Sequence, residues 1–171
     1  MKTRPRLLIG YDGSACADSA LNDLRRAGLP SEVEALVVSV GDAPILPVPS
    51  NVKAADQLSP ALEQTLELAS KASEWLQAYF PEWQVSAEAI KGAPARELIQ
   101  RAAQWKANLI VVGSQGRSAL GRLFLGSVSK AVATEAVCSV RIVRPSIAKL
   151  RSLVFCNMQH HVDRMPLVET K

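Results

Sequence analysis

Apolar positions along the chain alternate between two spacings, one typical of strands and the other typical of helices. Five short segments hold runs of apolar or β-branched residues, and the clearest, residues 109–112, reads Leu-Ile-Val-Val. A strand that is apolar at every position is typical of a parallel sheet covered on both faces. The pattern predicts strands at residues 6–12, 33–40, 84–90, 109–112 and 140–144.

Apolar residues three and four positions apart predict a helix after each of the first four strands. Gly28 ends the first predicted helix, while Pro60 and Pro94 open the second and third. The fourth runs from about residue 127 to residue 136. Residues 41–58 hold three prolines without a period and predict a long loop. The inward-facing positions of the second helix are predicted to be Leu62, Leu66, Ala69, Leu76 and Phe80.

This alternating order implies a parallel, doubly wound α/β sheet with right-handed crossovers. In such folds a ligand binds beyond the carboxyl ends of the strands, where the strand order reverses. Two of the predicted strand ends carry glycine turns: Asp12-Gly13-Ser14 follows the first strand, and a loop from Gly113 follows the fourth. If these two strands are neighbours, both turns line one crevice.

The loop of residues 113–127 is punctuated by glycines and leads into the fourth predicted helix. Free N–H groups at the start of that helix, near Ser127 and Val128, suit an anion. Arg117 and Arg122 add positive charge within the loop. Together these features favour a phosphate. The alternative is an ordinary connection from strand to helix, in which glycines permit tight packing.

Two familiar phosphate-binding loops are excluded. Gly121-x4-Gly126 has the glycine spacing of a Walker A loop, but Ser127 stands where that loop has its lysine. The dinucleotide signature GxGxxG is absent as well.

Composition narrows the possible functions further. A chain of 171 residues suggests about one domain, and 48% hydrophobic residues suffice for a core. The net charge is only +4, aromatic residues make up 5%, and no dense basic face is evident, so nucleic-acid binding is not indicated. No apolar run reaches the 18 or so residues of a membrane span, and the basic start lacks the apolar stretch of a secretory signal. We therefore expect no membrane association and a cytoplasmic location.

Cysteine and histidine placement argues against metal and nucleophilic chemistry. Cys16, Cys138 and Cys156 lie far apart, and the only histidines are His160 and His161. A zinc site needs about four such ligands at close spacing, and a catalytic triad needs a rigidly placed base. We predict no metal ligands and no catalytic residues.

The spacing Gly113-x2-Gly116-x9-Gly126-Ser127 resembles the nucleotide-binding signature of the universal stress protein family. Residues 108–129, 11–14 and 91–95 resemble that family as well, and the likeness covers roughly residues 4–145. It implies a Rossmann-like five-stranded sheet of order 3-2-1-4-5, with ATP held between strands one and four. It also implies one domain, residues 1–145, followed by a C-terminal extension, residues 146–171, whose role is unknown.

Carried over position by position, the resemblance assigns twelve residues to ATP. Asp12 would meet the adenine or ribose side, and the backbone of Val40 would border the adenine. Val112 and Gly113 would flank the ribose, and the start of the fourth helix would hold the phosphates. Turn formation is the alternative role for Asp12, and N-capping is that for Ser127. The complete expected set is Asp12, Gly13, Ser14, Val40, Val112, Gly113, Ser114, Gly116, Arg117, Gly126, Ser127 and Val128.

Three residues depart from the family pattern. Asn108 replaces the usual aspartate before the fourth strand, and Ser139 replaces the usual proline before the fifth. Arg141 stands inside the fifth strand, where an apolar residue is common. The resemblance implies a homodimer formed through that strand, whereas a charge on an edge strand acts against pairing.

The C-terminal extension, residues 146–171, shows a weak similarity to the first strand, so a vestigial repeat, a docked segment and a disordered end all remain open for it.

These observations predict an ATP-binding protein that acts as a regulator or sensor in the stress response. Mg²⁺ is the cation expected with ATP. No general base stands in the loop, so slow ATP hydrolysis is the most we expect of it. The alternative is a protein-interaction module of the same fold that uses no nucleotide. A nucleotidyl transferase is disfavoured, because no histidine precedes residue 160.

Overall fold

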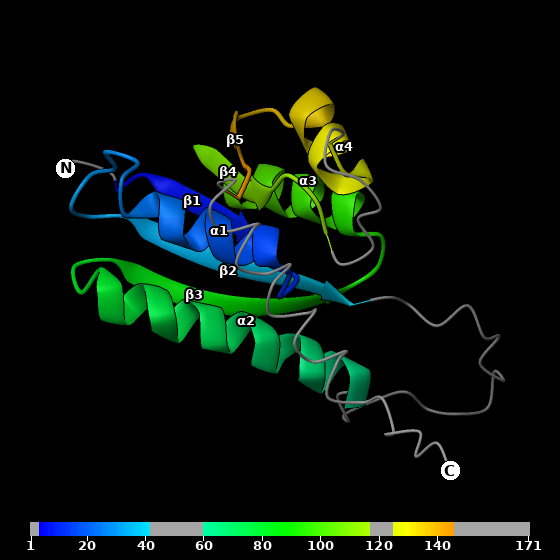
Figure 1. The fold of residues 1–171 in the computed structure, drawn as a ribbon, viewed down its shortest axis with the longest axis horizontal. Coiled ribbons are helices and arrows are strands. Elements are labelled where there is room, and N and C mark those ends of the chain that lie inside the picture. Colours follow the sequence, from blue (N-terminus) through cyan, green and yellow to red (C-terminus); the bar gives the residue numbers. More distant parts are fainter. Residues whose placement is uncertain (1–3, 42–59, 117–124, 146–171) are drawn as a thin grey trace, which may run out of the picture.

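The computed structural model describes residues 4–41, 60–116 and 125–145 of the chain. Within these residues strands and helices alternate from β1 to β5 (Figure 1). The elements are β1 (Arg6–Gly10), α1 (Ala15–Leu24), β2 (Glu34–Gly41), α2 (Pro60–Tyr79), β3 (Gln84–Lys91), α3 (Pro94–Trp105), β4 (Leu109–Gly113), α4 (Ser127–Glu135) and β5 (Ser139–Val143).

The five strands of the described residues form one parallel sheet in the order β3-β2-β1-β4-β5. Gly10, at the end of β1, lies between Val38 of β2 and Val112 of β4 in the register. The strand order reverses at β1, so the carboxyl ends of β1 and β4 lie side by side. This architecture confirms the predicted Rossmann-like, doubly wound sheet.

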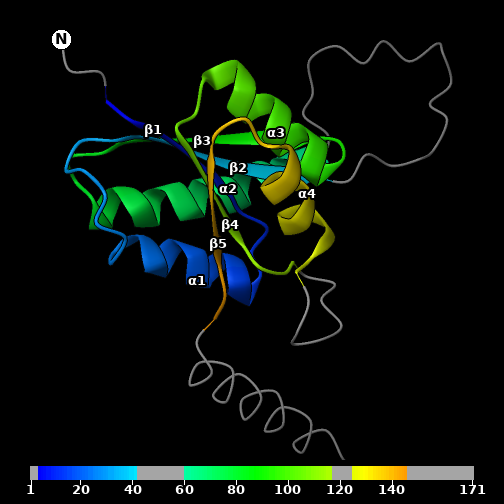
Figure 2. The same cartoon turned by 90° about the horizontal axis from the view of Figure 1, so that it is seen from above.

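Two layers of helices cover the sheet: α1 and α2 pack on one face and α3 and α4 on the other (Figure 2). Neighbouring residues of the central strands point to opposite layers. Val111 belongs to the core layer that includes α1 and α2, whereas Ile110 and Val112 belong to the layer that includes α3 and α4. All three side chains are buried, which explains why residues 109–112 carry no polar position.

Helix α1 ends at Leu24, earlier than the predicted stop at Gly28. The N–H groups of Arg26 and Ala27 donate to carbonyls only three residues back, those of Asp23 and Leu24, so the chain leaves the helix through a tighter turn. Gly28 then adopts a left-handed φ of +64°.

In α2 the fully buried residues are Ala69, Ala72 and Leu76. Ala72 was not among the predicted inward positions, whereas Leu62, Leu66 and Phe80 are only half-buried. Of the predicted strands, β2 begins and ends one residue later, at 34 and 41, and β5 begins and ends one residue earlier, at 139 and 143.

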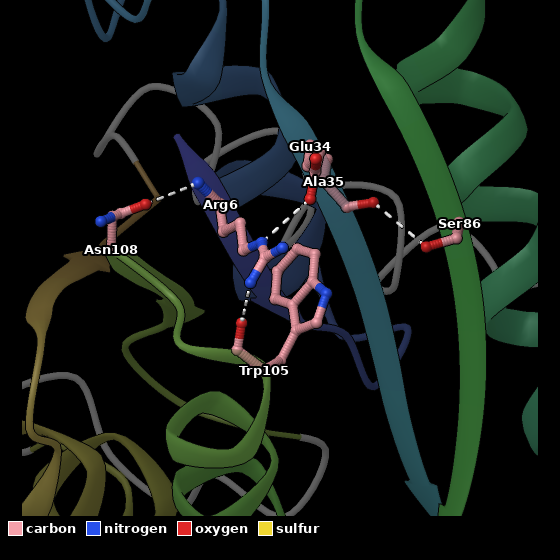
Figure 3. A network of polar contacts seen from close by, with 6 residues as sticks. All are labelled: Arg6, Glu34, Ala35, Ser86, Trp105 and Asn108. Carbon is pink, nitrogen blue, oxygen red and sulfur yellow. Dashed lines mark hydrogen bonds and ion pairs between the residues drawn. The ribbon is translucent and has the colours of Figure 1, made fainter. Parts of the chain in front are cut away.

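A network around Arg6 fastens the amino ends of the strands (Figure 3). Its backbone N–H donates to Asn108 Oδ1 at 2.7 Å, and its guanidinium donates to Glu34 and to the carbonyl of Trp105, each at 3.0 Å. Asn108 therefore pins the entrance of β4 to β1 through its side-chain oxygen. This network lies at the amino ends of the strands and leaves their carboxyl ends open to other roles.

No helix among the described residues is long and apolar enough to cross a membrane.

Candidate functional site

The turn between β1 and α1 is built by the three residues that the sequence singles out there. Asp12 Oδ1 accepts a hydrogen bond from the N–H of Ser14 at 3.0 Å, which closes the turn. Gly13 has a φ of +75°, a left-handed conformation that disfavours a side chain. Ser14 Oγ accepts from the N–H of Ala17 at 3.2 Å and so caps α1. The start of α1 is thus closed by its own cap.

This turn meets the segment that follows β4. Ser14 Oγ donates to the backbone carbonyl oxygen of Gln115 at 3.4 Å, which links two loops about 100 positions apart in sequence. A β-carbon on Gly116 would lie 2.9 Å from Asp12 Oδ2. The Asp12 carboxylate therefore lies against the backbone of Gly116, and the two glycine turns line one edge of the sheet, as predicted.

Gly113 permits a closer approach still. A β-carbon there would lie 2.7 Å from the carbonyl carbon of Cys16 and 2.8 Å from the nitrogen of Ala17, both backbone atoms of α1. No real β-carbon tolerates such a contact, so only glycine lets β4 and the first turn of α1 pack at this distance.

The end of β2 is fixed to the same turn. Ser39 is buried, and its hydroxyl donates to the carbonyl of Tyr11 at 2.7 Å, while the N–H of Tyr11 donates to the carbonyl of Val38 at 2.9 Å. These two hydrogen bonds hold Tyr11, the residue before Asp12, against the end of β2. Val40 follows directly and packs, half-buried, toward α3 and α4.

Tyr11 carries the strongest electrostatic perturbation near the site. Its hydroxyl donates to Asp18 Oδ1 at 2.7 Å. Partial burial raises the pKa of the Tyr11 phenol well above its usual value, and the hydrogen bond to Asp18 and the negative charges of Asp18 and Asp12 add to the effect. The phenol is therefore protonated at any physiological pH.

The start of α4 contrasts with that of α1. Its N-cap is Gly126, which provides no side-chain hydrogen bond. The first N–H groups of a helix have no intrahelical acceptor, and the helix dipole places partial positive charge there. Ser127 is exposed and Val128 half-buried. This helix start offers N–H donors to an anion, which is the chemistry of phosphate sites.

Ser114 anchors the α4 start to the sheet. Its N–H donates to the carbonyl of Val143 at 2.8 Å, and its own carbonyl accepts from the N–H of Gly126 at 2.8 Å. A β-carbon on Gly126 would lie 3.3 Å from the α-carbon of Gln115, a tight contact. The segment that follows β4 and the first turn of α4 are thus packed against each other.

The structure brings most of the predicted residues to this one edge. Arg117 and Arg122 lie outside the described residues. Asp12, Gly13, Ser14 and Gly116 lie around the junction of the two turns, Gly126, Ser127 and Val128 lie at the α4 start, and Val40, Val112, Gly113 and Ser114 lie at the strand ends. Ser114 is buried, with its hydroxyl 3.9 Å from Cys16 Sγ.

Sequence reasoning missed Ser39 and Ser129, two buried serines whose hydroxyls bond to backbone at this edge. A serine inside an otherwise apolar strand or helix was the available signal. Among the described residues no group of three or more His, Cys, Asp and Glu side chains could hold a metal ion. The polar groups that the described residues place at this edge include the N–H groups at the start of α4, the Ser127 side chain and the Asp12 carboxylate.

The fold is that of a doubly wound α/β protein, a class in which ligands bind beyond the carboxyl ends of the strands, where the strand order reverses. The model of the universal stress protein family matches residues 3–144, and the chain belongs to this family. It is 35% identical over 138 residues to a universal stress protein of Thermus aquaticus, which covers 81% of this chain and 97% of the relative. Against several mycobacterial relatives that it matches, the chain spans only about half of their length.

Two similar solved structures contain nucleotides. One is a universal stress protein in complex with cAMP, with a TM-score of 0.60 and 21% identity over 85% of this chain and all of that one. The other is a universal stress protein family protein from Arabidopsis thaliana with AMP bound, with a TM-score of 0.55 and 15% identity over 85% of this chain and 94% of that one. At these identities the likeness establishes the common fold.

Proposed function

We propose that this chain binds an adenine nucleotide, ATP in the first place, and acts in the cytoplasm as a regulator or sensor in the stress response. The observation that carries the proposal is that the start of α4, which has no side-chain cap, lies at the same sheet edge as the Asp12 turn. The relatives with cAMP and AMP bound support an adenine nucleotide as the ligand.

The nucleoside part of the ligand is assigned to the ends of β1, β2 and β4. Asp12 would accept hydrogen bonds from a ribose hydroxyl or from the base. The backbone of Val40 would border the base, and Val112 and Gly113 would flank the ribose. The register supports this assignment, because these strand ends lie side by side around Gly10.

The phosphates are assigned to the α4 start and the segment after β4. Backbone N–H groups of Ser127 and Val128 would donate to phosphate oxygens, and the hydroxyl of Ser127, which is an exposed residue, would do the same. Gly116 and Gly126 would let the phosphates approach the backbone closely. Ser114 would hold the segment after β4 against the first turn of α4 through its backbone hydrogen bonds. Arg117, which the sequence places directly after Gly116, would add positive charge.

Binding, rather than turnover, is the chemistry that these groups support. Efficient phosphoryl transfer needs a positioned nucleophile and metal ions held against the phosphates. We assign no catalytic residue, and slow hydrolysis is the most that we propose. Mg²⁺ accompanying ATP would be held chiefly by phosphate oxygens and water, as this ion commonly is.

We also propose a homodimer formed through β5, which in the described residues pairs only with β4 and so has a free edge. Arg141 is the residue that opposes this arrangement. Its guanidinium lies 2.6 Å from Asp23 Oδ2 of α1, so its charge is paired within the subunit. That pairing removes part of the repulsion that two unpaired arginines would bring to a shared edge.

Thermal and denaturant unfolding with and without ATP tests the nucleotide proposal. A ligand that binds only the folded state at 100 times its Kd stabilises it by about 2.7 kcal/mol. We expect this stabilisation in the wild type and none in Gly116→Val, provided that circular dichroism shows the variant to be folded. No stabilisation of the wild type at millimolar ATP would favour the nucleotide-independent interaction module instead.

A further inference from the structure

Ser129 is the third residue of α4, and it is only 2% exposed. Its hydroxyl lies 2.9 Å from the carbonyl oxygen of Ser114 and 3.0 Å from that of Gly126. Ser114 directly follows β4, so this one side chain joins the first turn of the helix to the end of a central strand. A hydroxyl has a single proton to donate, and both acceptors are within its reach.

Neither carbonyl depends on Ser129 for a partner. The Ser114 carbonyl also accepts from the N–H of Gly126 at 2.8 Å, and the Gly126 carbonyl also accepts from the N–H of Lys130 at 2.9 Å. Removing the hydroxyl leaves no buried acceptor unsatisfied, so the fold should tolerate its loss. What the hydroxyl adds is a second, side-chain tie between the strand end and the helix start.

We propose that Ser129 is a positioning residue for phosphate binding. This inference rests on the proposed nucleotide function. The N–H groups of Ser127 and Val128 belong to the turn that Ser129 holds, and N–H donors must point at the phosphate oxygens to bind them well. The groups assigned to the nucleoside lie on the strand ends, which other bonds hold. Loss of the Ser129 hydroxyl therefore weakens the binding of ATP more than it weakens the binding of adenosine.

The test compares the affinities of ATP and adenosine, with adenosine added as a competitor at up to millimolar concentration. For Ser129→Ala we expect the affinity for ATP to fall about five- to tenfold, which corresponds to the loss of about one hydrogen bond. The affinity for adenosine should change less than about twofold. Ser19→Ala is the matched control. Ser19 is also a buried helical serine, but its hydroxyl donates within α1, to the carbonyl of Ala15 at 2.7 Å. This control should leave both affinities unchanged.

An isosteric pair guards against a general packing effect. Ser129→Thr keeps the hydroxyl and Ser129→Val lacks it, while both add the same bulk. We expect the threonine variant to retain the higher ratio of ATP to adenosine affinity. Equal ratios in this pair, or equal losses for both ligands in Ser129→Ala, would overturn the positioning role. A wild type that binds neither ligand would instead overturn the proposed function, and this inference with it.

Discussion

The carboxylate of Asp12 lies against Gly116, so close that a β-carbon on this glycine would stand 2.9 Å from Asp12 Oδ2. These residues follow two different strands, and their contact joins the turn after β1 to the segment after β4. In the proposed site Asp12 faces the nucleoside and Gly116 the phosphates. A side chain at position 116 should therefore affect nucleotide binding more than it affects the stability of the fold.

We expect Gly116→Ala to weaken ATP binding about tenfold while changing the free energy of unfolding by less than about 1 kcal/mol. The Asp12 carboxylate is the end of a side chain and can move away from the new methyl group, but it then leaves its place in the site. Isothermal titration calorimetry with ATP and urea unfolding measure the two effects separately.

Gly28→Ala is the control for this variant. Gly28 has a φ of +64° and open space around it, so alanine there should cost about 1 kcal/mol of stability through backbone strain alone. ATP affinity should stay within twofold of the wild type. Wild-type ATP affinity in Gly116→Ala would contradict the place assigned to Gly116.

Gly113→Ala should behave in the opposite way. Its β-carbon would meet backbone atoms of Cys16 and Ala17 at 2.7 and 2.8 Å, and backbone cannot step aside as a side chain can. We expect a loss of about 3 kcal/mol or more in the free energy of unfolding, at the upper end of overpacking effects. Denaturant unfolding without nucleotide measures this loss. A loss below 1 kcal/mol would show that α1 and β4 can separate at little cost.

The ion pair between Asp23 and Arg141 bears on the proposed dimer. Both side chains are about one-third exposed, so the pair itself should contribute less than about 1 kcal/mol to folding. We expect Asp23→Ala to weaken dimerisation several-fold at low salt, because it frees the Arg141 charge near the β5 edge. Sedimentation equilibrium measures this effect. Added salt and the double variant Asp23→Ala/Arg141→Ala should each restore the dimer, and a dimer unaffected by Asp23→Ala would place the interface elsewhere.

Tyr11 should make stability depend on alkaline pH. Its folded-state pKa is raised above the ordinary value of about 10, so the folded protein holds the phenolic proton more tightly than the unfolded chain does. The resulting stability is fully present below pH 10 and is lost as the pH rises toward the folded-state pKa. Urea unfolding between pH 8 and pH 11 should show a steeper decline for the wild type than for Tyr11→Phe. Parallel declines would mean that the phenol is not perturbed.

The sheet could be predicted from the sequence because the strands differ in their pattern of apolar and polar positions. Residues 109–112 carry no polar position, which indicated a central strand with helices on both faces. The glycines at 113 and 116 were interpreted chiefly as part of a phosphate loop, with tight packing as the alternative, and at each of them a β-carbon would meet a neighbouring atom at less than 3.0 Å. The resemblance to universal stress proteins added the strand order, which periodicity alone does not specify.

The rest could not be predicted, because it depends on which residues meet across the fold. Ser39 and Ser129 bond to carbonyls 28 and 15 positions away, and no local pattern shows a hydroxyl's partner. In the sequence Arg141 is a single charge within a strand, whereas in the fold it lies beside Asp23 of α1. The early end of α1 likewise follows from hydrogen bonds that glycine and proline signals do not specify.

Equilibrium dialysis of the wild-type protein against ATP, with AMP and cAMP in parallel, measures nucleotide binding itself. We predict saturable retention of ATP, with one nucleotide bound per chain, and weaker retention of ATP by Gly116→Ala at the same concentrations. If the protein is folded by circular dichroism and retains none of the three nucleotides at millimolar concentration, the chain is not a binder of adenine nucleotides.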